Sequence, residues 1–153
     1  MIKKKKEAKV SEFIPQFPDK YIGKYPIICR SSWERMYAQW LDSNPFVVEW
    51  MSEGNVVPYF DPVKGKQRRY YPDFYAVVKN NGKSRKFLIE IKPYKETVPP
   101  KNTKRKSFKT KKHQEETHIT NQAKWKAAKQ YCKKMGYTFK VFTEKTLFLQ
   151  EKR

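Results

Sequence analysis

The chain has few of the residues that build sulfur-rich metal sites or disulfide networks. Its 153 residues include only two cysteines, Cys29 and Cys132, which lie far apart. Two distant cysteines with no second pair make neither a zinc site nor a disulfide framework, so we interpret both as reduced thiols of a cytosolic protein. The two histidines, His113 and His118, fall in a polar stretch that we expect to be a solvated loop.

Long apolar runs are also missing from the sequence. No apolar segment approaches the length that crosses a bilayer, so we expect no membrane partner. The first residues, MIKKKKEAK, are charged and lack the apolar region of a signal peptide. We expect residues 1–28 to form a basic N-terminal arm that lies either on the body of the protein or on a partner.

Negative charge is scarce, with 15 Asp and Glu against 35 Lys and Arg and a net charge of +20. This excess is more than solubility requires and predicts a polyanionic partner, with nucleic acid as the leading candidate. An anionic membrane surface fits less well because the basic stretches lack an apolar face. Aromatic residues make up 16% of the chain, which excludes a disordered basic tail and predicts one folded domain over residues 29–153.

The spacing of apolar residues predicts a mixed α/β domain. An apolar stripe predicts a helix over residues 32–43, with Ser31 and Glu34 placed as in a capping box. A second helix is predicted over 120–136, beyond a mobile basic loop at about 94–119. Strands are predicted over 46–51, 55–60, 70–78, 85–92 and 137–143, and a basic turn over 64–69. Pro58 either places the second strand at an edge or breaks it.

Two carboxylates face each other in the predicted hairpin. The turn Asn81-Gly82 favours a tight hairpin, and counting outward from it places Asp73 directly opposite Glu90. Their Cβ atoms would then be about 4.5–5.5 Å apart, and Lys92 shares the same face because side chains alternate along a strand.

Like charges directly opposite each other destabilise a sheet, so this pair requires an explanation. A shared proton, an ion pair with Lys92 and a bound cation are all available, as is a plain solvent-exposed face. Mg²⁺ binds through one or two carboxylates together with waters and phosphates, and the pair suits that role.

The sequence Pro72-Asp73 followed by Glu90-Ile91-Lys92, after a helix that carries Glu34, resembles the PD-(D/E)XK nuclease superfamily. The segments RSSWERMYAQWLDSNPFVVEWMSE, RRYYPDFY, FLIEIKPYKETVPP and KWKAAKQYCKKMGYTFKVFTE resemble the head completion nucleases of tailed bacteriophages. The resemblance implies a restriction-endonuclease-like core, with a mixed, mostly antiparallel sheet flanked by helices.

The resemblance also implies an activity and a setting. It implies a Mg²⁺-dependent deoxyribonuclease, with Mn²⁺ as a substitute ion, that acts on packaged DNA during head completion before tail joining. It implies location in the virion, or in the host cytoplasm during assembly, and partners among the phage capsid, portal or neck proteins.

Site residues follow from the same resemblance. Asp73 and Glu90 would bind the metal together with the Ile91 carbonyl. Lys92 would orient the attacking water or stabilise charge on the phosphate, and Glu34 would complete the site, although its capping-box role explains it equally well.

We expect DNA to be held through its phosphates with little sequence preference, because nothing in the chain resembles a base-reading module. The expected DNA-binding residues are the basic side chains of the turn, the loop and the second helix: Lys66, Arg68, Arg69, Lys101, Lys104, Arg105, Lys106, Lys109, Lys126 and Lys129. The alternative is a non-catalytic structural DNA-binding protein, a plug or neck component of the head with the same fold. A generic RNA-binding protein is a third reading, and it leaves the opposed carboxylates unexplained.

Overall fold

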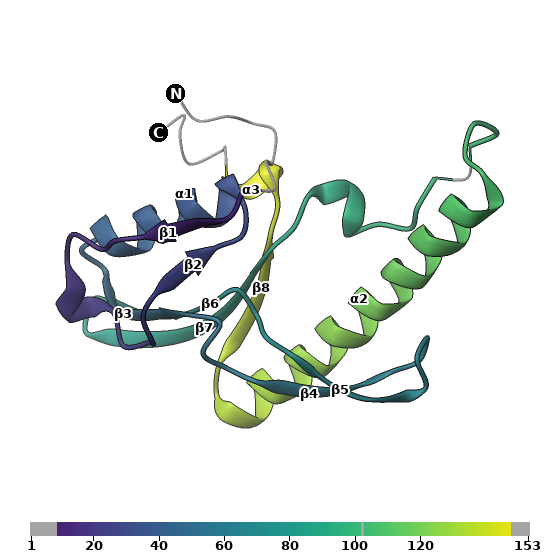
Figure 1. Ribbon diagram of the computed structural model, residues 1–153. Helices are drawn as coiled ribbons and strands as arrows, with labels where there is room; N and C mark the ends of the chain where they lie inside the picture. Colours follow the sequence, from purple (N-terminus) through teal and green to yellow (C-terminus); the bar gives the residue numbers. More distant parts are fainter. Residues whose placement is uncertain (1–8, 102, 148–153) are drawn as a thin grey trace.

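The computed structural model describes residues 9–101 and 103–147. The elements in chain order are β1 (Ser11–Phe13), η1 (Pro18–Lys20), β2 (Ile27–Cys29), α1 (Ser32–Ser43), β3 (Val47–Ser52), β4 (Val57–Asp61), β5 (Lys66–Tyr70), β6 (Phe74–Asn80), β7 (Lys83–Ile91), η2 (Tyr94–Glu96), α2 (Phe108–Met135), β8 (Thr138–Phe142) and α3 (Glu144–Leu147) (Figure 1). No helix among these residues combines the length and apolar character that a membrane crossing needs.

The central sheet has four strands in the order β3-β6-β7-β8. Only the β7–β8 pair is parallel, so the mixed, mostly antiparallel sheet is confirmed. The β6–β7 hairpin has the predicted register, from Asn80 opposite Lys83 to Phe74 opposite Ile89. Its two turn residues have positive φ angles, 51° at Asn81 and 77° at Gly82, as a tight two-residue hairpin turn requires.

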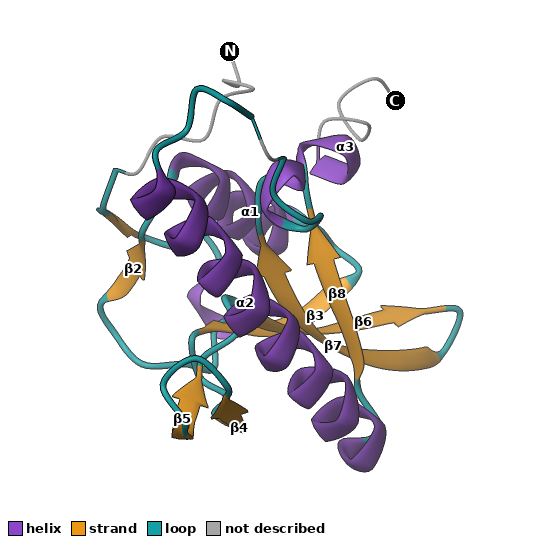
Figure 2. Cartoon of the chain, turned by 90° about the vertical axis from the view of Figure 1, so that its right-hand side faces the viewer, coloured by secondary structure: helices purple, strands orange, loops and turns teal. Residues whose placement is uncertain are grey.

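Alternating side chains give the sheet two apolar faces, each with its own cover. One face, which includes Trp50 and Phe74, packs under α1 and the β1–β2 pair. The other face, which includes Leu88, packs against α2 and the two-stranded β4–β5 hairpin. The two helices thus lie on opposite sides of the sheet (Figure 2).

Helix α1 has the predicted bounds, because Ser31 caps it by accepting a hydrogen bond from the Glu34 N–H at 3.2 Å. Within the described part of the chain β4 pairs only with β5, so Pro58 lies on an unbroken edge strand.

The predicted basic turn over 64–69 is wrong, since Lys66–Tyr70 forms strand β5. Four of its five residues are exposed, and its basic residues do not alternate with apolar ones, so nothing in the sequence indicated that this segment pairs with β4. Only 62–65 forms the turn, where Asp61 accepts hydrogen bonds from the N–H groups of Val63 and Lys64.

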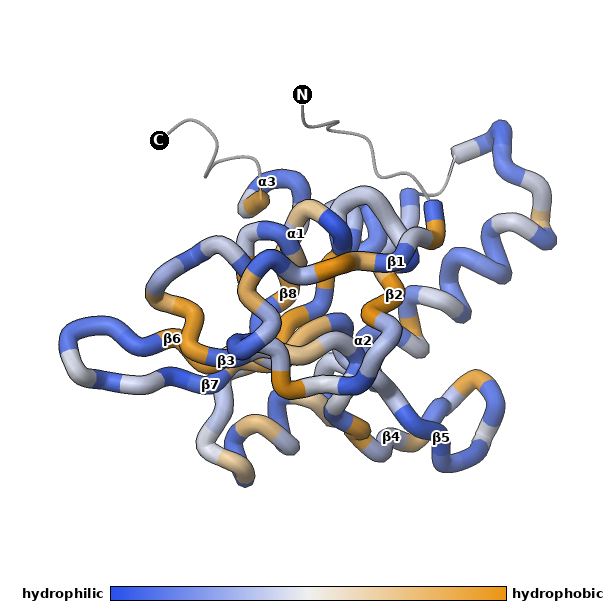
Figure 3. Tube along the Cα trace, turned by 60° about the vertical axis from the view of Figure 1, so that its left-hand side comes forward, coloured by the Kyte–Doolittle hydropathy of each residue, from blue (hydrophilic) through white to orange (hydrophobic). Residues whose placement is uncertain are grey.

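The predicted mobile loop at 94–119 is wrong from Phe108 onward, where α2 begins. Ser107 caps this helix by accepting a hydrogen bond from the Thr110 N–H. Within the helix, Lys112 forms an i,i+4 ion pair with Glu116. Apart from Phe108 and Ile119, the first half of α2 consists of polar residues and is coloured mostly as hydrophilic in Figure 3. Apolar spacing therefore gave no signal there. His113 and His118 therefore lie on a helix and not in a loop.

The predicted N-terminal arm, over its described part, is an integral layer of the domain. Phe13 is 4% exposed and packs edge-on against Trp50. Tyr21 is 7% exposed and contacts the same indole. The Lys20 amine donates to three carbonyls at the C-terminal end of α1, an arrangement that complements the helix dipole. Residues 1–8 of the arm lie outside the described residues.

Cys29 and Cys132 are buried free thiols, and they lie in different apolar clusters on opposite sides of the sheet. Burial raises the pKa of the Cys29 thiol to about 12 and that of Cys132 to about 11, so both stay protonated and unreactive.

Packing of the N-terminal layer predicts a contrast between two phenylalanines. Phe13→Ala should destabilise the fold by about 3–5 kcal/mol, because a buried ring is lost. Phe17→Ala should have almost no effect, because Phe17 is 52% exposed. Urea denaturation of both variants measures this, and equal stabilities would show that the layer does not contribute to the core.

Candidate active site

Asp73 lies where the β6–β7 ladder stops. The last paired residues are Phe74 and Ile89, and Asp73 stands one position beyond, in the link from β5 to β6. Its carboxylate Oδ2 accepts the Ile91 N–H at 2.7 Å, so a side chain replaces the next backbone bond of the ladder. A strand residue directs its N–H and C=O to the same neighbour, so the Ile91 carbonyl faces the Asp73 edge as well.

Glu90 is buried near the end of β7, on the face that α2 and the β4–β5 hairpin cover. Its Oε2 accepts a hydrogen bond from the Tyr70 hydroxyl at 2.6 Å. Its Oε1 lies 4.0 Å from the Lys92 Nζ. The Lys92 backbone N–H donates to the Phe142 carbonyl on β8, which holds the base of this lysine in place.

Glu34 reaches the same region from the first turn of α1. It is buried, and its Oε2 accepts a hydrogen bond from the Arg30 N–H at 2.9 Å. The Ser31 half of the predicted capping box is therefore present, while the carboxylate bonds one residue earlier than the box requires. Glu34 thus fixes the start of α1 and also adds its charge to the site.

The three carboxylates act on one another electrostatically. Burial raises the pKa of Asp73 well above its usual value, and the charges of Glu90 and Glu34 raise it further. Burial also raises the pKa of Glu90, against the opposing effects of the Tyr70 hydrogen bond and the Lys92 charge. Carboxylates under such strain favour binding of a cation.

The donor atoms at this point fit a hard divalent cation. Asp73 and Glu90 provide carboxylate oxygens and Ile91 provides a carbonyl, and such ligands suit Mg²⁺ completed by waters and substrate phosphates. Among residues 9–101 and 103–147, no group of three or more His, Cys, Asp or Glu side chains is placed to hold a metal ion.

Two residues that the sequence analysis did not select lie beside Glu90. Tyr70 ends β5, and its ring centroid is 5.6 Å from the Lys124 Nζ on α2. Burial lowers the pKa of Lys124, and so does the nearby charge of Lys92. The buried residues Asn121, Trp125 and Ala128 share its side of the helix, so a helical wheel extended to polar residues would have found Lys124.

The expected DNA-binding residues are spread over two regions. Lys66, Arg68 and Arg69 lie exposed on β5, with Arg68 paired to Asp61 at 3.2 Å. The others are Lys101, Lys104, Arg105, Lys106 and Lys109 around the start of α2, and Lys126 and Lys129 farther along it.

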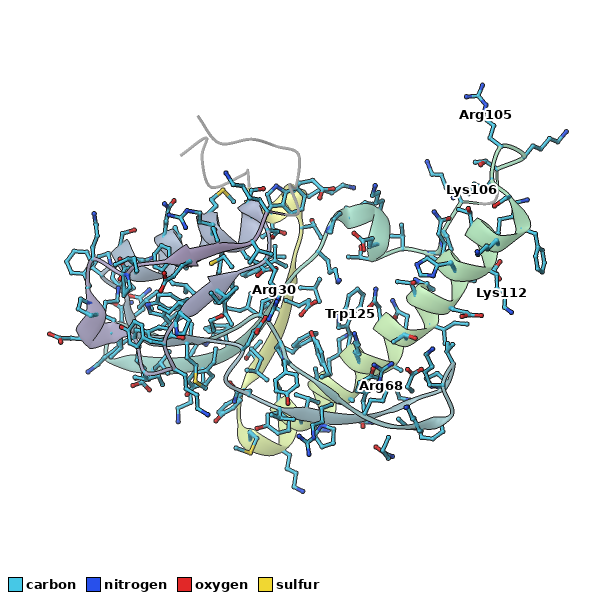
Figure 4. All side chains as sticks on the ribbon, viewed as in Figure 1. Arg30, Arg68, Arg105, Lys106, Lys112 and Trp125 are labelled. Carbon is cyan, nitrogen blue, oxygen red and sulfur yellow. The ribbon has the colours of Figure 1, made fainter. Side chains whose placement is uncertain are left out.

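Lys126 and Lys129 lie on the part of α2 that packs on the β4–β5 hairpin, whereas the residues around the start of α2 lie apart from it. In Figure 4 Arg105 and Lys106 mark the outer end of α2, while Trp125 and Arg68 lie nearer the sheet. The Lys106 amine donates to the Lys101 carbonyl and the Gln114 side chain, so it is already engaged within the protein.

Asp73 lies at the start of one strand, and Glu90-Ile91-Lys92 lies at the end of the next. A third acid, Glu34, lies on a flanking helix. This arrangement is that of a nuclease of the restriction-endonuclease-like fold. The family described as TnsA-like endonuclease N terminal matches residues 44–144. The chain is also 38% identical over 137 residues to the head completion nuclease of Enterobacteria phage T4, covering 87% of this chain and 89% of that protein. The chain therefore belongs to the TnsA-like endonuclease family and is a homologue of that head completion nuclease. No solved structure matches it.

The raised pKa values predict how the metal-free protein responds to pH. An acid whose pKa is higher in the folded than in the unfolded state binds more protons when folded, so stability falls as pH rises from the unfolded pKa through the folded one. Asp73→Asn removes one of these charges and keeps an oxygen for the Ile91 N–H.

In chelator at neutral pH, Asp73→Asn should therefore melt a few degrees above wild type, and the difference should shrink as the pH is lowered. Thermal melts across pH measure this. A variant less stable than wild type at neutral pH would contradict the strain between the acids.

Proposed function

We propose that this protein is a Mg²⁺-dependent deoxyribonuclease that cleaves DNA phosphodiester bonds on packaged phage DNA during head completion, before tail joining. The observation that carries the proposal is the convergence of Asp73, Glu90 and Lys92 at the open end of the β6–β7 ladder. The homologous head completion nuclease supports the setting.

Asp73, Glu90 and the Ile91 carbonyl would hold the Mg²⁺ ion, and Mn²⁺ would substitute for it. A bound divalent ion makes water more acidic and neutralises phosphate charge. Asp73 is oriented by the Ile91 N–H, and Glu90 by the Tyr70 hydroxyl, so both present fixed oxygens. Glu34 is held by the Arg30 N–H and completes the acidic side of the site.

Lys92 and Lys124 provide positive charge on the other side of Glu90. The Lys92 amine is 4.0 Å from Glu90 and partly exposed, which suits it to orient the attacking water or to stabilise charge on the phosphate. Lys124 has no carboxylate within ion-pair distance among the described residues, and it lies over the rings of Tyr70 and Tyr59. We propose that Lys124 contacts a phosphate next to the bond that is cut.

DNA backbone binding is assigned to exposed basic residues on β5 and α2. Lys66 and Arg69 extend from the β4–β5 hairpin, and Lys126 and Lys129 from the helix that packs on it. Contacts of this kind are made to phosphates and carry little sequence information.

A structural DNA-binding component of the head, without turnover, is the second candidate. The net charge of +20 favours DNA binding in either case. Buried carboxylates whose pKa values are raised favour catalysis, because such shifts gather at functional sites.

Cleavage is the first test of the proposal. Wild type should cut plasmid or linear DNA with Mg²⁺ or Mn²⁺ and not with chelator. Asp73→Ala and Lys92→Ala should each reduce the rate by about 100-fold or more, as expected when one stabilising group is removed from a reacting centre. Gel assays measure cutting, and filter binding in chelator measures DNA affinity. If wild type and both variants bind DNA and none cuts it, the structural candidate is correct.

Two lysines on the same helix separate catalysis from binding. Lys124→Ala should lower the maximal cleavage rate by about 10-fold or more, because it removes a charge beside the reacting phosphate. Lys126→Ala, on the exposed side of α2, should change only DNA affinity, by less than about 10-fold. Single-turnover rates at saturating protein measure the first effect. Equal losses of rate in both variants would show that Lys124 has no special place.

A further inference from the structure

Tyr70 is a buried hydroxyl donor at the boundary between the acidic site and the basic hairpin. It is the last residue of β5, is 4% exposed and pairs with Val57 on β4. Its hydroxyl lies 2.6 Å from Glu90 Oε2, a short hydrogen bond of the kind made to a charged acceptor. The three residues Lys66, Arg68 and Arg69 on the same strand are exposed.

Glu90 depends on this hydroxyl for its orientation. A glutamate side chain has three rotatable bonds, and among the described residues Tyr70 is the hydrogen-bond donor to its carboxylate. Lys92 stands 4.0 Å from the other oxygen, which is an ion-pair contact without hydrogen-bond geometry. The Tyr70 bond therefore holds the Glu90 carboxylate in one orientation, with its other oxygen directed toward Lys92.

The Tyr70 ring is itself held from several sides. Val57, Tyr59 and Trp125 belong to the same apolar cluster, and the Lys124 amine lies over the ring. Strand β5 reaches the rest of the fold through its pairing with β4 and the packing of the hairpin beneath α2. A displacement of the hairpin would therefore move the hydroxyl relative to Glu90.

We propose that Tyr70 is a positioning residue that orients Glu90 for metal binding and links the basic hairpin to the metal site. The inference rests on the proposed metal-dependent nuclease function. Partners that orient a metal-binding carboxylate typically change metal affinity or activity by about 10–100-fold when removed.

Tyr59 provides a matched control. It is 4% exposed, lies on the adjacent strand β4, and its ring also lies beneath the Lys124 amine, at 6.0 Å. Its hydroxyl makes no hydrogen bond to another described residue, unlike that of Tyr70. Tyr70→Phe and Tyr59→Phe therefore remove the same atom from the same cluster, and only the first removes a contact with Glu90.

The test measures Mn²⁺ binding by calorimetry, the Mg²⁺ dependence of cleavage, and DNA affinity in chelator. Tyr70→Phe should weaken Mn²⁺ binding by about 10-fold and raise the Mg²⁺ concentration needed for half-maximal rate. Its DNA affinity in chelator should equal that of wild type. Tyr59→Phe should match wild type in all three measurements.

A double-mutant cycle separates positioning from general loss of packing. In a Glu90→Gln background, Tyr70→Phe should weaken residual Mn²⁺ binding no further, because the hydroxyl then has no carboxylate to orient. Wild-type Mn²⁺ affinity in Tyr70→Phe, equal losses in both phenylalanine variants, or full additivity in the cycle would each overturn the inference. If wild type itself neither binds Mn²⁺ nor cuts DNA, the proposed function fails first, and the inference fails with it.

Discussion

The hydrogen bond from the Ile91 N–H to the Asp73 carboxylate ends the central hairpin and creates the site. Backbone pairing between β6 and β7 stops at Phe74 and Ile89, and the Asp73 side chain takes the next donor of β7. An acid used in this way cannot move away from the strand that carries Glu90 and Lys92. Two acids and a lysine are thereby held at one sheet end in a protein that otherwise has a large excess of positive charge.

The arrangement places two acids in surroundings that disfavour their charged forms. Burial and mutual repulsion raise the pKa values of Asp73 and Glu90, so the metal-free fold is strained at neutral pH. The Tyr70 hydroxyl and the Lys92 charge lower the pKa of Glu90 and so offset part of the effect of burial. A bound divalent cation would offset the remaining repulsion between the acids. The covering layer of β4, β5 and α2 contributes both the Tyr70 contact and the exposed basic residues, so site and basic surface are built from the same elements.

The parts of the fold that sequence reasoning found have strong local signals. The Asn81-Gly82 turn determined the register of β6 and β7, and the Ser31 cap with its apolar stripe determined α1. The elements that sequence reasoning missed consist mainly of charged and polar residues, so they lack the apolar spacing by which helices and strands were predicted. Strand β5 is mostly exposed, and the first half of α2 is exposed or half-buried up to Asn121. Both form because a partner strand, a cap and one i,i+4 ion pair support them.

The same limit applies to the site. The hairpin register alone predicted that Asp73, Glu90 and Lys92 lie close together. It did not predict that the Asp73 carboxylate turns to the Ile91 N–H at the end of the ladder. Tyr70 and Lys124 come from separate elements, and only the packing of the β4–β5 hairpin under α2 brings them to Glu90. The N-terminal aromatics Phe13 and Tyr21 likewise gave no sign in the sequence that their partner is Trp50.

The central claim is that the ends of β6 and β7 bind a divalent ion. A crystal of the wild-type protein soaked in Mn²⁺ and recorded at the manganese absorption edge locates that ion directly. One strong anomalous peak is expected within ligand distance, about 2.0–2.5 Å, of a carboxylate oxygen of Asp73, a carboxylate oxygen of Glu90 and the Ile91 carbonyl. A fully exchanged crystal with no peak between those residues, or with manganese bound only elsewhere, would contradict it.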